Sequence, residues 1–301
     1  MKCQMIGRRL RGAMLAAFAC TFCGSASADG DHKAETAAIA KDFVQVLFVR
    51  HDVKQAYAKY MTADFIQHNP EIRSGQHGDD DFLSKRRERD PQHYLPVEQW
   101  RDVIDHVLVD DKTFAVHHHV YTSATDHGRV FVDIWRTENG KLVEHWDIIQ
   151  AVPDQPVNPT PMWGDRVAPR PVEHGRVSPE AVIRAYMKLG LDEHRPAEAA
   201  ERYISPDFVQ HSPHIPPGKP GLIRYFAQQS AAETASPRVS NLSHMLVDGD
   251  LVLLHRHVTR GPQDLGTMYA DLFRVQHGQI VEHWDVIQAV PPTSVNGNSM
   301  W

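Results

Sequence analysis

The feature that most limits how this chain can fold is a duplication within it. Residues 106–163 and 244–301 share 26 identical residues over 58 pairs that align without a gap. Further upstream, residues 60–70 align with 203–213, and both contain Asp-Phe followed two residues later by Gln-His. Two copies of this length predict a pair of globular domains with the same fold rather than a solenoid.

The duplication also sets the expected domain boundaries. The first copy keeps a Met-Trp pair at 162–163, where the second copy ends with Met-Trp at 300–301. Because a linker would have no reason to keep the same Met-Trp pair, residues up to 163 are expected to belong to the first domain. We therefore expect a first domain at 29–163, a Pro-rich linker at 164–178 and a second domain at 179–301.

Residues 1–28 have the pattern of a secretory signal peptide. Basic residues come first, an apolar run covers residues 13–22, and small residues precede the expected cleavage after Ala28. The 3 cysteines of the chain all lie in this segment, so the mature protein would be held together by core burial without disulfides. The apolar run is too short to span a bilayer comfortably, which favours a signal peptide over a membrane anchor. We expect a periplasmic or secreted protein that does not engage a membrane once the leader is removed, because no second apolar stretch approaches membrane length.

Composition and motifs exclude several function classes. The formal net charge is −6, and the chain lacks the surplus of Lys and Arg with which proteins neutralise phosphate, so we expect no nucleic-acid partner. The sequence contains no Gly-rich phosphate loop and no nucleophile elbow, and no cysteine remains after the leader. Nucleotide-dependent and acyl-enzyme chemistry are therefore disfavoured, and we expect no cofactor.

Each copy is typical of helices followed by strands. Helical periodicity or helix-start signals lie at 34–49, 53–60 and near 79–87, and in the second copy at 179–191, 196–203 and 221–229. Strands are expected at 97–109, 113–121, 129–137 and 141–152, with a hairpin turn at Asn139-Gly140. This order predicts an α+β fold in which helices pack on a bent antiparallel sheet and leave a pocket between the two layers.

One aspartate in the third predicted strand of each copy is the main candidate for chemistry. Aromatic residues stand two positions before and two positions after both Asp133 and Asp271. Because alternate strand residues share a face, each carboxyl group would lie among aromatic rings, where burial raises its pKa and suits it to move protons. The alternative is a structural carboxylate bound to the backbone or to His119.

The register of the last hairpin decides which residues share the face of Asp133. A two-residue turn would place Trp146 opposite Asp133, with Glu144, Ile148 and Gln150 on the same face. A three-residue turn would bring His145 and Asp147 there instead. The sequence leaves both registers open.

A histidine pair on the second predicted strand recurs in both copies. His117 and His119 would share one face, as would His255 and His257. A pair of histidines on one strand needs a third ligand to form a metal site, so we expect no metal. The alternative is metal-assisted hydrolysis, with Asp133 as the third ligand of the first pair.

At this point the motifs resemble a known family. The segments Asp271-Leu272-Phe273-Arg274 and Glu282-His283-Trp284-Asp285 of the second copy, together with their equivalents at 133–136 and 144–147, resemble the SnoaL-like polyketide cyclases. That family has the cystatin-like cone fold shared with nuclear transport factor two and ketosteroid isomerase. The resemblance implies two tandem cone domains in this chain.

The same resemblance implies a reaction. SnoaL-like cyclases close a ring by an aldol condensation without a cofactor, with an aspartate as general acid and base beside a histidine. Transferred to this chain, the resemblance assigns the carboxylate to Asp133 and Asp271 and its partner to His119 and His257. The substrate would be a small hydrophobic carbonyl compound, and the step would be of the aldol, cyclase or isomerase type.

Further residues are expected to bind that substrate. They are Gln67, His68, His117, Trp135, Trp146, Gln210, His211, His255, Phe273 and Trp284. The competing hypothesis is an exported module that binds a small molecule in the same cavity without catalysis. In either case the two halves could pair as an intramolecular pseudo-dimer.

Overall fold

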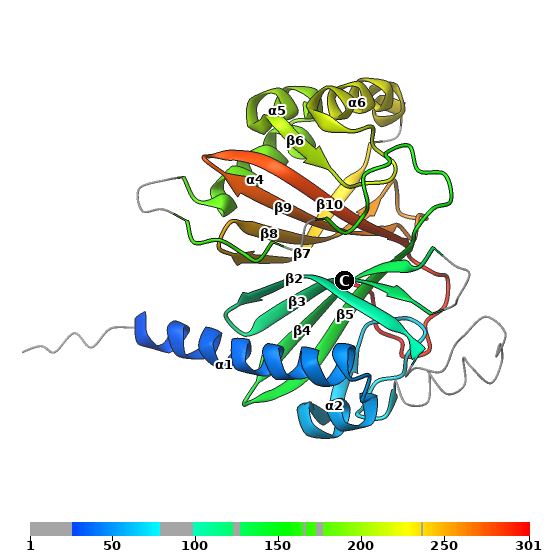
Figure 1. Ribbon diagram of the computed structural model, residues 1–301. Coiled ribbons are helices and arrows are strands. Elements are labelled where there is room, and N and C mark those ends of the chain that lie inside the picture. Colours follow the sequence, from blue (N-terminus) through cyan, green and yellow to red (C-terminus); the bar gives the residue numbers. More distant parts are fainter. Residues whose placement is uncertain (1–25, 79–98, 123–126, 165–166, 173–176, 236) are drawn as a thin grey trace, which may run out of the picture.

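The protein consists of two halves of the same design, each with helices followed by a five-stranded sheet (Figure 1). The computed structural model describes residues 26–78, 99–122, 127–164, 167–172, 177–235 and 237–301. The first half contains α1 (Ala26–Val44), η1 (Gln45–Val49), α2 (Val53–Tyr60), β1 (Met61–Gln67), β2 (Arg101–Asp110), β3 (Thr113–Tyr121), β4 (Arg129–Glu138) and β5 (Lys141–Ala151). The second half contains α4 (Pro179–Met187), η3 (Lys188–Asp192), α5 (Pro196–Tyr203), β6 (Ile204–Gln210), α6 (Gly218–Ala235), β7 (Val239–Asp248), β8 (Leu251–Thr259), β9 (Thr267–Gln276) and β10 (Gln279–Ala289).

The predicted α+β class is confirmed, with one correction to the sheets. Their strand orders are β1-β5-β4-β3-β2 and β6-β10-β9-β8-β7. β1 and β6 pair in parallel with the last strand of their half, so the sheets are mixed rather than antiparallel. The expected strands did not include these two segments, each of which directly follows a helix.

Two helices, α2 and α4, begin where the sequence places capping residues. Ser178 Oγ accepts a hydrogen bond from Ala181 N at 3.2 Å, and Pro179 occupies the first turn of α4. Asp52 caps α2 in the same way, through Gln55 N at 3.0 Å. Of the predicted leader only residues 26–28 are described, at the start of α1, and the helix expected near 79–87 lies outside the described residues. In the described part of the chain, every helix is too short or too polar to cross a bilayer.

A bulge sets the register of each last hairpin. Asn139 and Gly140 form a tight two-residue turn with φ of 49° and 74°, which glycine adopts without strain. Thr137 then pairs with Leu142 but Arg136 pairs with Glu144, so β5 carries one extra residue. Asp133 consequently faces Asp147. The second half repeats this arrangement, and Asp271 faces Asp285.

The helix-facing side of each sheet is packed with aromatic and aliphatic residues. In the first half, the Phe43 ring of α1 lies edge-on to Trp135 at 5.2 Å, and Trp135 stacks on Phe114 at 5.1 Å. In the second half, Ile183 of α4, Phe208 of β6 and Phe273 of β9 belong to the corresponding core. A cavity adjoins each of these two cores, between the helices and the sheet.

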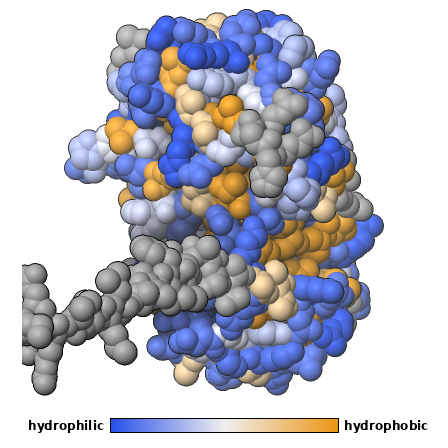
Figure 2. Space-filling view, turned by 90° about the vertical axis from the view of Figure 1, so that its left-hand side faces the viewer, coloured by the Kyte–Doolittle hydropathy of each residue, from blue (hydrophilic) through white to orange (hydrophobic). Residues whose placement is uncertain are grey.

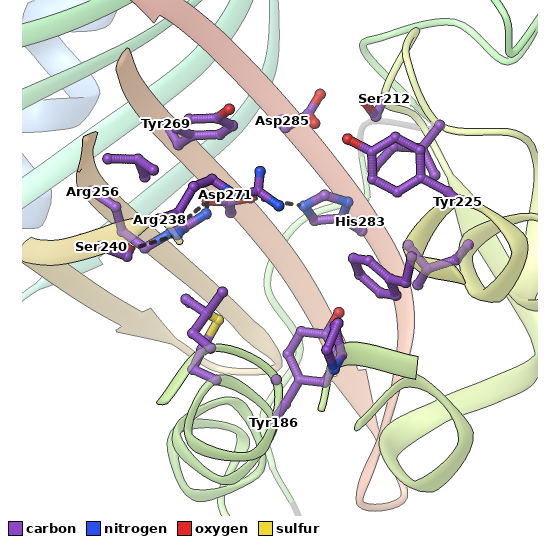
Figure 3. Close-up of a pocket in the computed structure, with 18 of the residues that line it drawn as sticks. Tyr186, Ser212, Tyr225, Arg238, Ser240, Arg256, Tyr269, Asp271, His283 and Asp285 are labelled. Atoms are coloured by element: carbon purple, nitrogen blue, oxygen red, sulfur yellow. Dashed lines mark hydrogen bonds and ion pairs between the residues drawn. The ribbon is translucent and has the colours of Figure 1, made fainter. Parts of the chain in front are cut away.

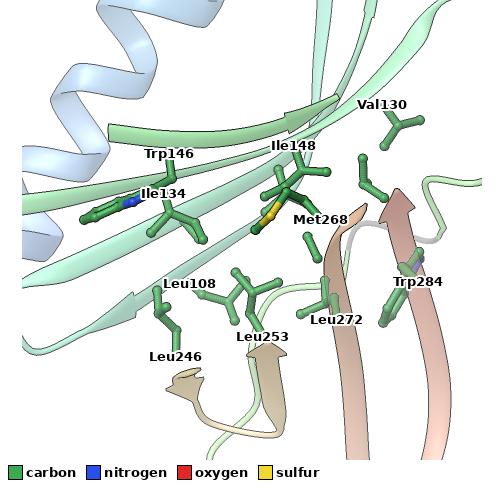
Figure 4. Close-up of a cluster of buried hydrophobic side chains, with 14 of the residues drawn as sticks. Leu108, Val130, Ile134, Trp146, Ile148, Leu246, Leu253, Met268, Leu272 and Trp284 are labelled. Atoms are coloured by element: carbon green, nitrogen blue, oxygen red, sulfur yellow. The ribbon is translucent and has the colours of Figure 1, made fainter. Parts of the chain in front are cut away.

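The opposite sides of the two sheets pack against each other and form a third core (Figure 4). Leu108, Ile134 and Ile148 come from the first sheet, and Leu253 and Leu272 from the second. Apolar residues also gather in a band at mid-height on the surface, where the halves meet (Figure 2). Each sheet is thus covered on both faces, by its own helices and by the other sheet.

Reciprocal hydrogen bonds hold the two sheets together. Gln150 Oε1 accepts from Ile287 N at 2.8 Å, and Gln288 Oε1 accepts from Ile149 N at 2.8 Å. The contact between the halves therefore has approximate twofold symmetry.

The segments that follow β5 and β10 cross to the other half. After β5, Asn158 Nδ2 donates to Gln210 O at 2.6 Å. After β10, Asn296 Nδ2 donates to Asn69 O at 2.6 Å and Asn298 Nδ2 donates to Gln67 O at 2.9 Å. We call residues 153–163 and 290–301 the exchanged tails. They explain structurally why the first copy keeps the ending that the second copy has.

Candidate active sites

Each half has a cavity between its helices and its sheet, and the larger of these two lies in the second half. Its volume is about 370 Å³. Apolar side chains from α4, β6 and α6 form one wall, and polar residues of β8, β9 and β10 form the other. Figure 3 shows Asp271 between Arg256 and His283, with Asp285 on the neighbouring strand.

Asp271 is a buried carboxylate with cationic and imidazole partners. Arg256 donates to its Oδ2 through Nε at 2.9 Å and Nη2 at 2.6 Å, and His283 Nε2 lies 3.2 Å from Oδ1. Burial alone would raise the pKa of Asp271, but the charge of Arg256 and the contact with His283 outweigh it and lower the pKa. Asp271 is therefore an anion with both oxygens engaged.

Asp285 lies in the same cavity and has the opposite character. Burial raises the pKa of its carboxyl group, although the Ser212 hydroxyl bonds to it. Among the described residues, Oδ1 of Asp285 has no hydrogen-bond partner, and the residue is 4% exposed. Two facing carboxyl groups whose pKa values are shifted apart are the arrangement that acid/base catalysis uses.

The first half contains the same pair of aspartates beside a smaller cavity of about 150 Å³. His118 Nε2 donates to Asp133 Oδ2 at 2.6 Å, and His145 Nε2 lies 2.9 Å from Oδ1. Burial would raise the pKa of Asp133, but these contacts outweigh it and lower the pKa. On the facing strand, burial raises the pKa of Asp147 to about 6.

A chain of ionisable groups continues behind His118. Its Nδ1 donates to Asp102 Oδ1 at 3.0 Å, and His51 Nε2 lies 3.2 Å from Asp102 Oδ2. Burial opposes protonation of His118, yet its two carboxylate partners raise its pKa to about 9. His118 is therefore an imidazolium at neutral pH. It occupies the place that Arg256 has in the second half, and Ser240 there replaces Asp102.

Of the residues expected to catalyse or bind, four line the cavities. Asp133 and Trp135 line the smaller one, and Asp271 and Phe273 line the larger one. Gln67 and Gln210 lie behind the cavities, where Gln67 Oε1 accepts from His145 Nδ1 at 3.0 Å and Gln210 Oε1 accepts from His283 Nδ1 at 2.9 Å. They orient the histidines rather than touch a ligand.

The predicted pairing of the aspartates with His119 and His257 does not occur. The alternation of β3 and β8 places both histidines on the face toward the other half. His119 Nδ1 bonds to Asp105 Oδ2 at 2.8 Å and its ring stacks on Trp163, while His257 bonds to Leu265 O and stacks on Trp301. The aspartates are instead contacted by the residues that precede these histidines in the sequence, His118 and Arg256.

Six more residues expected to bind substrate also face the contact between the halves. His68 stacks on Trp146 at 4.7 Å, and His211 stacks on Trp284 at 5.0 Å. His117 Nδ1 lies 3.2 Å from His106 Nδ1, and His255 Nδ1 lies 3.1 Å from His244 Nδ1. The bulges cause the error for the tryptophans, because one extra residue moves them to the other face. The metal set of His117, His119 and Asp133 is excluded by strand alternation, because the histidines and the aspartate point to opposite faces of the sheet.

The residues that complete the two sites were not among the expected site residues, although His145 and Asp147 were an open alternative for the face of Asp133. They are His118, His145 and Asp147 in the first half and Arg256, His283 and Asp285 in the second. A signal was present, because the Glu-His-Trp-Asp motif recurs in both halves and offers either His and Asp or Glu and Trp to the cavity. Only the bulge, which has no clear sequence mark, decides between them.

The chain resembles known proteins over its second half. The family described as SnoaL-like domain matches residues 183–283. A comparison with curated proteins gave no match.

Several solved structures are similar to one half of the chain. IdmH from Streptomyces antibioticus, a proposed polyketide cyclase, is 21% identical over 37% of this chain and 92% of its own, with a TM-score of 0.29. A proposed ketosteroid isomerase from Kribbella flavida is 17% identical over 41% of this chain and 83% of its own, with a TM-score of 0.33. An NTF2-like protein from Cytophaga hutchinsonii is 13% identical over 38% of this chain and 95% of its own, with a TM-score of 0.29. What the family match establishes is that residues 183–283, which include Asp271 and the first residues of the Glu-His-Trp-Asp motif, form a SnoaL-like domain.

Proposed function

We propose that the second half is a cofactor-independent acid/base enzyme that acts on a small hydrophobic carbonyl compound, in a step of the aldol, cyclase or isomerase type. One observation carries this proposal. In a largely apolar cavity, Asp285 has a raised pKa and an unpartnered oxygen, and it faces an aspartate that Arg256 and His283 keep ionised. The family match of residues 183–283 supports the same reaction class.

Asp285 is the group that we propose to move the proton. Both oxygens of Asp271 are engaged, by Arg256 and His283, whereas Oδ1 of Asp285 is free to reach a substrate. Ionised Asp285 would take a proton from the carbon next to the carbonyl group. The resulting enolate carbon would either be reprotonated or attack a second carbonyl carbon, and Asp285 would return the proton to carbon or to the new alkoxide. The family resemblance implied instead that Asp133 and Asp271 take the proton, and this role stays a prediction.

Tyrosine side chains lie in the cavity where the carbonyl oxygen would bind. Tyr186, Tyr225 and Tyr269 line the cavity. Burial raises the pKa of Tyr186, so its hydroxyl stays protonated and can donate a hydrogen bond to an oxygen on which negative charge develops.

The volumes of the two cavities favour the second half as the place of turnover. Ligand pockets have volumes of about 300–1,000 Å³. The cavity of the second half, about 370 Å³, falls in this range, and that of the first half, about 150 Å³, does not.

Proton exchange tests the proposal directly. A thermal-shift screen of small carbonyl, steroid-like and aromatic compounds would first identify ligands, and deuterium uptake at the carbon next to the carbonyl would then be followed in D₂O. We expect Asp285→Asn to slow exchange by about 10²–10⁴-fold. Asp207→Asn, at an exposed aspartate of the same half, is the control. Ligands that stabilise the protein without exchange would instead favour the binding module.

Export is part of the proposed function and rests on the leader pattern alone. N-terminal sequencing of the protein recovered from the periplasm or medium is expected to begin at Asp29. A chain that keeps residues 1–28 would contradict this.

A further inference from the structure

Three ligand atoms converge beside the cavity of the first half. One atom each of Asp133, His145 and Asp147 lie within 4.8 Å of one another, and all three residues are buried. His145 Nε2 and Asp133 Oδ1 are 2.9 Å apart. Adjacent ligand atoms around a small metal ion lie about this far apart, since bonds to zinc measure about 2 Å.

The other atom of each group is held by a neighbour. His118 donates to Asp133 Oδ2 at 2.6 Å, and Asn69 Nδ2 donates to Asp147 Oδ2 at 2.6 Å. Gln67 Oε1, which can only accept, fixes the proton of His145 on Nδ1 at 3.0 Å. Partners that orient ligands from behind in this way are a regular part of metal sites.

Two of the inward-facing atoms, His145 Nε2 and Asp133 Oδ1, contact each other. With its proton on Nδ1, a neutral His145 presents the lone pair of Nε2 to a carboxylate oxygen. Such a contact needs a positive charge, which is either a second proton on the ring or a metal ion. Asp147 Oδ1 adds a second oxygen, which is buried and has no hydrogen-bond partner among the described residues.

We propose that the first half binds one divalent transition metal ion through Asp133 Oδ1, His145 Nε2 and Asp147 Oδ1. One nitrogen and two carboxylate oxygens suit zinc and its neighbours in the first transition row. The cavity of the first half, which all three residues line, leaves a further coordination position for water or a small ligand. Three protein ligands and one open position are typical of a catalytic rather than a structural zinc site.

The charges of the two halves explain why the ion is assigned to the first half alone. In the first half, the surroundings of Asp133 and Asp147 contain the imidazolium of His118 and also the carboxylate of Asp102, which is paired with it. The second half has Ser240 in place of Asp102 and the permanent cation Arg256 bound to Asp271. A dication is therefore opposed by a fixed guanidinium in the second half and attracted by an extra carboxylate in the first. Within the described residues, such a group of ligand atoms is found only in the first half.

Metal titration of the full chain tests this assignment. Protein purified without an affinity tag and dialysed against a chelator would be titrated with Zn²⁺ alone by calorimetry. It would then be titrated with Co²⁺ alone, followed by its visible absorption. We expect one tight site per chain. Asp147→Asn should weaken Zn²⁺ binding by about 100-fold or more and remove the Co²⁺ bands. Asp285→Asn, the matched change in the second half, should alter neither.

The controls separate metal binding from folding and from the proposed reaction. Circular dichroism would show whether the metal-free Asp147→Asn protein is folded. If it is not, Asn69→Ala replaces it, with an expected loss of about 10–100-fold because Asp147 loses its partner. Absence of a tight site, two equivalent sites, or binding that survives these substitutions would overturn the proposal. The proton exchange proposed for the second half would stand or fall separately, because it is measured on metal-free protein.

Discussion

At the scale of the residue, the site of each half depends on a cation that holds one aspartate ionised. The first half uses His118, whose pKa is raised to about 9 by two carboxylates despite burial, and the second half uses Arg256. The two residues differ in chemistry but place a positive charge at the same register position of β3 and β8. When the two copies are aligned, this position is a mismatch, His in the first and Arg in the second, although both side chains carry a positive charge.

Removing the cation should leave a buried anion without a partner. Arg256→Met is expected to lower the free energy of unfolding by about 3–5 kcal/mol, because Asp271 would stay buried and lose its ion pair. Arg256→His, which copies the first half, should cost less. Urea unfolding at pH 7 measures both, and equal stability of Arg256→Met and the unchanged protein would contradict this account.

At the scale of the element, the sequence predicted most helices and strands but not the faces of the last strand. Residues 53–60, 113–121 and 196–203 form the predicted elements with the predicted bounds. Periodicity and capping residues are local signals, and they were sufficient there. The bulge of β5 has no clear mark in the sequence, and the parallel pairing of β1 depends on β5, a strand far along the chain. For this reason Asp133 could be predicted as a site residue from its own strand, whereas His145 and Asp147 could only be left as an alternative.

In the turn that precedes the bulge of β10, the glycine should tolerate substitution poorly because of its positive φ angle. Gly278 has φ of 77°, and a Cβ there would meet nothing within 4 Å. Gly278→Ala is therefore expected to destabilise the protein by about 1–2 kcal/mol through strain without a clash. His277→Asn, at the neighbouring position with φ of 53°, should be neutral or slightly stabilising. Thermal unfolding of both variants checks the prediction, and an unchanged melting temperature for Gly278→Ala would refute it.

At the scale of the whole molecule, the two sheets form one shared core. Leu108, Ile134, Leu253 and Leu272 are each at most 1% exposed because the other half covers them. Neither half can therefore expose this face to water without a large loss of apolar burial.

A half expressed alone should replace its missing partner with a second copy. Residues 29–163 are expected to form a homodimer, since the covered face has approximate twofold symmetry in the intact chain. Analytical ultracentrifugation would show this. A stable monomer would mean that the contact between the halves contributes little to folding.

Acid should weaken the contact between the sheets through its buried histidines. Burial lowers the pKa of His106 and of His255 to about 3, and nearby His211 and Arg274 add to the effect at His106. In the unfolded chain these histidines take up protons near pH 6.5, so the stability they contribute is present above that pH and is lost as the pH falls toward 3.

The size of this effect can be measured by difference. From pH 7 to pH 5, each histidine should remove about 2 kcal/mol from the free energy of unfolding. Raised pKa values such as that of Asp285 act in the opposite direction, so the comparison is with a variant. The double variant His106→Gln and His255→Gln should lose about 4 kcal/mol less than the unchanged protein over this range. Parallel losses in urea unfolding would reject the role of these histidines.

The exchanged tails give the last residues of the chain an effect at its opposite end. Asn296 and Asn298 hold the backbone of Asn69 and Gln67, whose side chains orient Asp147 and His145. Replacing both tail asparagines by alanine should speed amide hydrogen exchange at 67–72, at about 1 kcal/mol per lost bond, and leave 210–215 unchanged. Asn158→Ala should do the reverse. A change at residues 296–298 would then be felt in the site of the first half rather than in the half that carries these residues.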